Sequence, residues 1–338
     1  MEYIKELEKG LKEKGYGKTY INRCVRYSES LLENSLPVIF DKQHLAKLLG
    51  MNINTLSYYL LVGDSFYKII HIPKKNGNYR KISMPSYNLK YIQRWILNNI
   101  LYNIPVNDQC MGFVKGRSIL NNAQPHINKE LVINLDIEKF FDTIKFEQIF
   151  RTIYQQGYTR EVSFILTKLL THKGYLPQGS PASPYMANLV AQGIDRRFYK
   201  LSNKIGATYT RYADDITISG NRKIYGYIKT YIKILKQEGF RVNNEKLKIQ
   251  FKKYRQEVTG LIVNNERVTV KKEVKRDLRK HIYYCRKFGV YKHLQNTGNE
   301  YKAHFKEYLY GKARYIYMIE PAEGINFFKE LSEIDWES

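Results

Sequence analysis

The sequence predicts an α+β protein in which a small antiparallel sheet carries a group of carboxylates. In residues 208–220, two runs rich in Tyr, Thr and Ile flank the adjacent acids Asp214 and Asp215. β-branched and aromatic residues around a short polar centre are typical of a strand, a tight turn and a second strand. A further apolar run, residues 131–136, is typical of a buried strand and ends at Asp136. Residues 146–170 and 223–239 have the apolar spacing of helices.

The three aspartates together predict a metal site. Adjacent carboxylates repel each other, and burying them without a partner is costly. A hard divalent cation with oxygen ligands removes that cost. If the two predicted strands pair, Asp136 comes next to Asp214 and Asp215, which predicts a two-metal site suited to phosphoryl or nucleotidyl transfer. The backbone carbonyl of Ile137 is a further candidate ligand.

The charge of the chain predicts a polyanionic partner. The 338 residues carry a formal net charge of +24, and 30 tyrosines are interleaved with Lys and Arg. Aromatic rings that stack on bases and cations that track phosphates are what single-stranded nucleic acid requires. The alternative is a soluble basic protein from a Lys-rich, AT-biased genome, since net charge constrains partners and not fold.

Cysteine usage and the N-terminus predict a cytoplasmic protein without membrane association. Cys24, Cys110 and Cys285 are odd in number and far apart, which fits reduced thiols and neither a disulfide framework nor a zinc site. The first residues lack the apolar core of a signal peptide, and no apolar run approaches the length that spans a bilayer.

The N-terminal part is predicted to be helical. Residues 1–45 form a charged helical extension, and residues 44–60 contain two short amphipathic segments hinged near Gly50 and Asn52. These segments fit either a DNA-binding helix-turn-helix or two packing helices, and we favour packing because amphipathic helix pairs are common. Residues 67–85 then predict a hairpin whose turn contains Asn76-Gly77 and several cations. Such a turn suits a triphosphate, although charged turns are also ordinary solvent-exposed features.

Three motifs together resemble those of reverse transcriptases. Tyr212-Ala213-Asp214-Asp215 resembles their metal-binding box, and the strand ending at Asp136 resembles their first metal motif. Residues 176–184 resemble the loop that contacts nucleotide and template, with Ser180 where the family usually has Ala. The resemblance implies a right-hand polymerase with fingers, a palm built on a ferredoxin-like or RRM-like antiparallel sheet, and a helical thumb. Residues 46–264 would form fingers and palm, and residues 265–338 an RNA-binding thumb.

The resemblance also implies substrate contacts and cofactors. Two Mg²⁺ ions would bind at the aspartates, and the substrates would be dNTPs. Phe141 falls where the family carries the aromatic ring that excludes a 2′-hydroxyl, and Lys246 is the candidate proton donor to pyrophosphate. The complete set of implied substrate contacts is Lys74, Arg80, Phe141, Gln178, Gly179 and Lys246.

Two shorter elements narrow the resemblance to retron reverse transcriptases. Asn122-Ala123-Gln124-Pro125-His126 fits an Asn-Ala-x-x-His element, and Val258-Thr259-Gly260 is the second marker. A histidine beside proline is usually a structural hydrogen-bonding group, so we do not assign His126 a catalytic role. The family copies part of a structured non-coding RNA into single-stranded DNA, primed from a 2′-hydroxyl of that RNA, which leaves a branched RNA–DNA product. It serves in antiphage defence, usually with an effector that would here be a separate chain.

A basic segment near the C-terminus predicts the face that holds nucleic acid. Residues 271–287 form a basic helix, and the excess of one sign favours a surface that tracks phosphates over an ordinary solvated face. The predicted nucleic-acid-binding residues are Arg117, Asn122, His126, Tyr212, Val258, Thr259, Gly260, Lys271, Lys272, Lys275, Arg276 and Arg279.

Three alternatives remain on the sequence alone. An intron-type reverse transcriptase would need a maturase region after the thumb, for which the chain ends too soon. An RNA-dependent RNA polymerase also uses paired acids, but Phe141 argues against it. A nucleic-acid-binding regulator built on the N-terminal helix pair would leave three carboxylates on apolar strands unexplained.

Overall fold

The computed structural model describes residues 2–73, 77, 79–298 and 303–337. The chain forms two compact units and passes between them repeatedly. The first unit comprises Met1–Val114, Ile137–Phe198 and Ile232–Val242, and the second comprises Lys115–Asp136, Tyr199–Tyr231 and Asn243–Ser338. The limits of these units differ from the predicted domain boundaries at residues 45 and 264. The division into extension, fingers and palm, and thumb remains a prediction.

The first unit begins with the predicted helices. They are α1 (Glu2–Glu13), α2 (Lys18–Glu33), α3 (Lys42–Leu48) and α4 (Ile53–Leu61). Asp41 and Asn52 cap α3 and α4 by accepting hydrogen bonds from backbone N–H groups, which fixes the hinge predicted near residue 50. Both helices pack against α9, as expected for packing helices.

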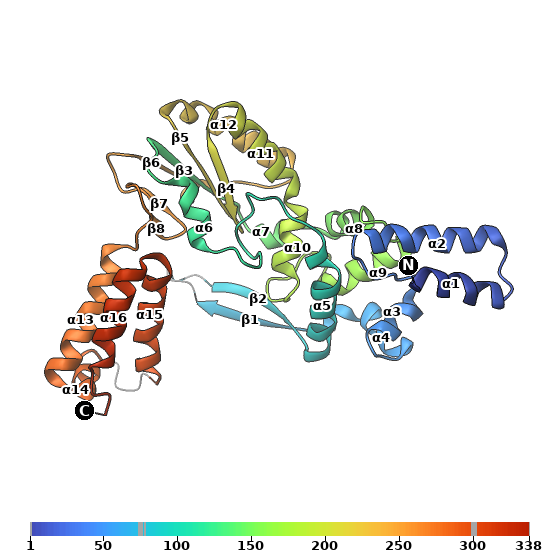
Figure 1. Cartoon of the computed structure of the whole chain (residues 1–338), viewed down its shortest axis with the longest axis horizontal. Helices are drawn as coiled ribbons and strands as arrows, with labels where there is room; N and C mark the ends of the chain where they lie inside the picture. Colours follow the sequence, from blue (N-terminus) through green and yellow to red (C-terminus); the bar gives the residue numbers. More distant parts are fainter. Residues whose placement is uncertain (1, 74–76, 78, 299–302, 338) are drawn as a thin grey trace. The chain divides into compact units, whose positions relative to one another are not determined.

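A two-stranded hairpin follows in the same unit (Figure 1). Strands β1 (Tyr67–Pro73) and β2 (Tyr79–Pro85) pair antiparallel from Tyr67↔Pro85 to Pro73↔Tyr79, as predicted. The predicted phosphate ligand Lys74 lies outside the described residues. The remaining helices of this unit are α5 (Tyr87–Asn99), α7 (Phe140–Thr143), α8 (Phe146–Tyr154), α9 (Arg160–Leu170) and α10 (Ser183–Val190). Helices α11 (Gln192–Lys204) and α12 (Ile228–Gln237) each contain residues of both units.

The second unit contains the predicted antiparallel sheet. Its strands are β3 (Leu131–Asp136), β4 (Thr208–Tyr212), β5 (Asp215–Gly220) and β6 (Lys248–Phe251), in the spatial order β4-β5-β3-β6. Strand β3 pairs antiparallel with β5 on one side and β6 on the other, so it is central. Five of its six residues are buried, which explains its nearly continuous apolar sequence.

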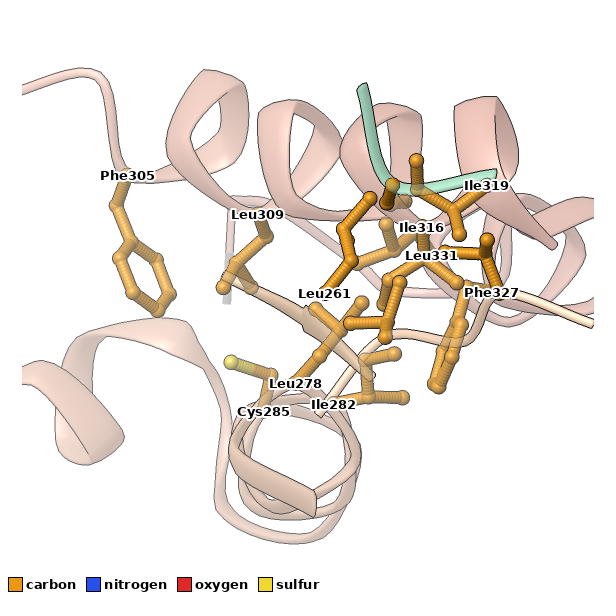
Figure 2. Packing of buried hydrophobic residues seen from close by; sticks show 14 of the residues in the cluster. Leu261, Leu278, Ile282, Cys285, Phe305, Leu309, Ile316, Ile319, Phe327 and Leu331 are labelled. Carbon is orange, nitrogen blue, oxygen red and sulfur yellow. The ribbon is translucent and has the colours of Figure 1, made fainter. Parts of the chain in front are cut away.

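A helical bundle completes the second unit. Its helices are α13 (Lys272–Phe288), α14 (Val290–Asn296), α15 (Phe305–Ile319) and α16 (Pro321–Ser332). A short hairpin of β7 (Glu257–Val258) and β8 (Leu261–Ile262) precedes it. Figure 2 shows Leu261 of this hairpin among Leu278, Ile282 and Leu309 of the bundle. The hairpin and the bundle therefore share one hydrophobic core. Within the described ranges, no helix combines the length and the apolar character needed to cross a bilayer.

Candidate active site

The sheet of the second unit brings the predicted aspartates together. Asp136 at the end of β3 lies directly opposite Asp215 at the start of β5. Side chains of directly opposed residues in an antiparallel pair share one face, with Cβ atoms about 4.5–5.5 Å apart. Asp214 occupies the two-residue turn between Tyr212 and Asp215. Three aspartates from two separate stretches of sequence thus lie at the same end of the sheet.

A buried arginine supports this turn. Ala213 adopts a left-handed backbone conformation with φ of 59°, which is unfavourable for a residue with a Cβ atom. Arg211 is completely buried, and its Nη1 donates a hydrogen bond of 3.0 Å to the carbonyl oxygen of Ala213. Arg211 was not among the predicted site residues, although a charged residue inside an apolar strand is a signal that could have identified it.

The local electrostatics favour a cation. Asp215 reaches solvent at the strand end, yet burial of its carboxyl, together with repulsion from Asp214 and Asp136, raises its pKa to about 6. Lys246, in the short helical turn η5 (Asn244–Lys246), partly offsets this effect. Its Nζ lies 2.8 Å from Oδ2 of Asp136, and this hydrogen bond is the main cause that raises the pKa of Lys246.

The three aspartate carboxylates suit a hard divalent ion, although Oδ2 of Asp136 accepts a hydrogen bond from Lys246. Carboxylate oxygens are the ligands that Mg²⁺ prefers. In the described part of the chain, no three His, Cys, Asp or Glu side chains are grouped as a metal site. Ile137, the other predicted ligand, follows β3 and forms a β-bridge with Val242.

A cavity of about 350 Å³ opens beside the carboxylates. Its lining comes from strands β3, β4, β5 and β6, from Lys246, from the start of α6 (Ile119–Ala123) and from the β7–β8 hairpin with its turn. The residues lining it are Ile119, Asn134, Leu135, Asp136, Tyr212, Asp215, Lys246, Lys248, Glu257, Thr259 and Gly260. A groove with acids on one wall and cations nearby can hold the end of a nucleic-acid strand.

The predicted nucleotide contacts lie in the first unit. Phe141 is partly exposed on α7 and packs against the rings of Phe113 and Phe140. Gln178 accepts a hydrogen bond of 2.7 Å from the backbone N–H of Ser83. A Cβ atom on Gly179 would lie 2.6 Å from the Ser83 carbonyl oxygen. The close approach predicted at Gly179 is thus to the backbone of β2.

The other predicted phosphate ligand on the hairpin is exposed. Arg80 lies on β2 with its side chain open to solvent, which leaves it available to an anion. Its role in binding triphosphate remains a prediction.

Several predicted nucleic-acid contacts need correction. Asn122, His126 and Val258 are completely buried, so their side chains have no surface for direct contact with RNA or DNA. Thr259 and Gly260 remain partly exposed and line the cavity, as does Tyr212. Val258 lies in the hydrophobic core, and Asn122 and His126 form hydrogen bonds within the protein. Direct contact of these three side chains with nucleic acid is therefore not supported.

The basic helix α13 divides into paired and exposed cations. Three predicted phosphate ligands form ion pairs instead: Lys271 with Glu257, Lys275 with Glu320 and Arg279 with Glu323. Lys275 is 16% exposed, so its ammonium serves the bundle and is a poor candidate for a phosphate contact. Lys272 and Arg276 are exposed and retain that prediction, and Arg117 is partly exposed before α6.

Comparison with known proteins agrees with this geometry. Residues 72–273 match the family described as Reverse transcriptase (RNA-dependent DNA polymerase). The chain is 34% identical over 266 residues to the Retron Ec86 reverse transcriptase of Escherichia coli, covering 77% of this chain and 83% of that protein. It is 31% identical over 341 residues to the Retron Mx162 reverse transcriptase of Myxococcus xanthus, covering 89% and 68% respectively.

A third relative extends the same result. The Retron Mx65 reverse transcriptase of Myxococcus xanthus is 30% identical over 320 residues, which cover 87% of this chain and 71% of that protein. The resemblance expected from the short motifs is therefore confirmed along most of the chain. The chain is an RNA-directed DNA polymerase with the right-hand polymerase fold, and it belongs to the retron reverse transcriptases.

Proposed function

We propose that this polymerase copies part of a cognate structured non-coding RNA into single-stranded DNA, starting from a 2′-hydroxyl of that RNA. The observation that supports this most is the pairing of Asp136 with Asp215 beside a cavity that can receive a strand end. The retron markers support the branched product, and the relatives named above are all retron enzymes. A role in antiphage defence with a separate effector protein belongs to the same proposal.

The proposed chemistry is assigned to the three aspartates. Asp136, Asp214 and Asp215 would hold divalent ions, with two Mg²⁺ as the expected set and Ile137 contributing its backbone carbonyl. Ions bound there would lower the pKa of the attacking hydroxyl and neutralise the leaving pyrophosphate. Lys246, whose ammonium hydrogen-bonds to Asp136, would donate a proton to the leaving pyrophosphate.

The other predicted substrate contacts belong to the same proposal. Arg80 on β2, together with Lys74, would contact the triphosphate of an incoming dNTP. Phe141 would pack against the deoxyribose and exclude a 2′-hydroxyl. Lys272 and Arg276 on α13 would contact the phosphates of the RNA.

A double substitution tests the assignment of the acids. Changing Asp214 and Asp215 together to Asn removes the negative charge with little change in shape, so DNA synthesis should be lost while RNA binding is retained. The matched control is Asp41→Asn, because Asn caps a helix as well as Asp does. Primer extension by the double variant at the wild-type rate would remove the assignment.

The nucleic acid that co-purifies with the protein tests the retron product. We expect a short DNA joined to RNA through a 2′,5′ linkage, identified by sequencing before and after debranching. Bulk cellular RNA without attached DNA would contradict the proposed priming reaction while leaving polymerase activity in place.

A further inference from the structure

The two retron markers meet each other in the second unit. The segment 119–126, which comprises α6 and the helical turn η3 (Gln124–His126), contains the first marker. The second marker forms the turn between β7 and β8, where Val258 pairs with Leu261. Asn122 Nδ2 donates a hydrogen bond of 3.3 Å to Thr259 Oγ1. Motifs separated by more than a hundred residues of sequence are thus joined through one buried amide.

Thr259 is held in an unusual backbone conformation. Its φ of 46° and that of 87° at Gly260 are both left-handed, as a two-residue hairpin turn of type I′ requires. A β-branched residue is strained there, which is an outlier that calls for an explanation. The Thr259 hydroxyl accepts from Asn122 and lies 3.5 Å from the carbonyl oxygen of Ile119, to which it donates. The hydroxyl of Thr259 therefore ties the turn to segment 119–126 both as an acceptor and as a donor.

At the other end of segment 119–126, His126 contacts the β4–β5 hairpin, which carries Asp214 and Asp215. His126 is completely buried, with Nδ1 2.7 Å from Ser219 Oγ on β5 and Nε2 2.8 Å from Thr210 Oγ1 on β4. Burial and the nearby Lys129 lower the pKa of His126 to about 3, so the imidazole is neutral at all working pH values. A neutral imidazole has one donor and one acceptor, which matches two hydroxyls on neighbouring strands. The Thr210 hydroxyl also lies 3.5 Å from the Asn122 carbonyl oxygen.

These contacts span the walls of the cavity beside the acids. Its lining includes Tyr212 and Asp215 of the β4–β5 hairpin and Thr259 and Gly260 of the β7–β8 turn. The β7–β8 hairpin is in turn embedded in the core of the helical bundle through Leu261 (Figure 2). Segment 119–126 is therefore hydrogen-bonded to both hairpins that line the cavity.

We propose that Asn122 and His126 are positioning residues that set the distance between the catalytic carboxylates and the Thr259–Gly260 turn, and thereby the placement of the priming strand end. This inference rests on the proposed function, because it assumes that the strand end enters that cavity. Under this inference the two markers share one role, which is to fix the geometry of the cavity. That role is consistent with the burial of Asn122 and His126, which prevents their direct contact with nucleic acid. A misplacement of about 1 Å at a reacting group can lower a rate by as much as 10²-fold.

The test compares variants that remove single hydrogen bonds. Thr259→Val removes the hydroxyl and keeps the shape, Thr259→Ser restores the hydroxyl, and Asn122→Leu removes the partner amide. Asn122→Ser replaces the leucine variant if that protein does not fold. The control is Tyr231→Phe, which removes a buried hydrogen bond of 2.7 Å to Ser202 in the same unit, away from the cavity lining. Extension is measured on a synthetic primer–template, with the dNTP and Mg²⁺ dependence and the Kd for RNA.

We expect Thr259→Val and Asn122→Leu each to lower kcat about tenfold, with RNA affinity and Mg²⁺ half-saturation within about twofold of wild type. The double variant should be no slower than either single variant, because both remove the same contact. Thr259→Ser should recover most of the rate, and Tyr231→Phe should reduce thermal stability alone.

Three outcomes would overturn the inference. The first is that the Asn122 variants behave like Tyr231→Phe, which would leave Asn122 a purely structural role. The second is that Thr259→Val alone slows extension, which would indicate direct contact between Thr259 and the nucleic acid. The third is multiplication of the two effects in the double variant. Because the substrate is a synthetic primer–template, none of these outcomes depends on the branched product, and absence of extension by the wild-type protein would instead count against the proposed active site.

Discussion

Replacing Asp215 with Asn should make the protein more stable while removing its activity. The pKa of Asp215 rises from 3.8 to about 6, because burial and two neighbouring carboxylates disfavour the charged form in the folded state. A shift of that size corresponds to a ceiling of about 3 kcal/mol. Asp215 is exposed at its strand end, so solvent screening reduces the effect, and we expect a gain of about 1 kcal/mol at pH 7.5. For a unit of this size, that gain raises Tm by about 2–4 °C.

The pH dependence of this gain has a definite sign. Because the folded pKa is raised, the charged carboxylate destabilises the fold as pH rises from about 4 to about 6, and the penalty is complete above that range. The stabilising effect of Asp215→Asn should therefore be present at pH 7.5 and absent near pH 4. Mg²⁺ should raise the Tm of the wild-type protein and leave that of the variant nearly unchanged, because only the former gains a bound cation.

Denaturant and thermal unfolding in EDTA measure these differences, and Asp41→Asn serves as the control for charge removal at a cap. A variant less stable than wild type at pH 7.5, or equally stabilised at both pH values, would refute the electrostatic reasoning. It would mean that hydrogen bonds of the Asp215 carboxylate outweigh its repulsion from Asp136 and Asp214.

Three further predictions concern separate parts of the chain. Phe141→Ala should lower the preference for dNTPs over rNTPs about tenfold or more, measured as the ratio of kcat/KM values, and an unchanged ratio would exclude the ring from sugar selection. Gly179→Ala should cost about 2–3 kcal/mol of stability because φ is 134° and the added Cβ meets the backbone of β2, whereas Gly206→Ala, with open space around it, should cost about 1 kcal/mol. Lys272→Met should weaken RNA binding and reduce the salt slope by about one, while Lys275→Met should chiefly lower Tm; the reverse order would show that the paired cation is the phosphate ligand.

The sequence alone determined the local chemistry of this protein. The apolar run ending at Asp136, the hairpin around Asp214 and Asp215, and the Asn-Gly turn of the first hairpin follow from period, propensity and turn residues, which act over a few neighbours. The structure confirmed the strand ending at Asp136, the hairpin around Asp214 and Asp215, and the pairing of the two strands of the first hairpin. Asn76 of the Asn-Gly turn lies outside the described residues. The two retron markers likewise indicated the family, because short motifs reflect local chemical requirements.

Only the tertiary structure decided which polar residues face solvent and which face each other. Asn122 and His126 were predicted to contact nucleic acid, yet both are buried and hydrogen-bonded within the protein. Lys275 looked like its neighbours in a basic helix, but Glu320, 45 residues away, pairs with it. Burial and ion pairing depend on residues distant in sequence that folding brings into contact, and a single sequence contains no local signal for them.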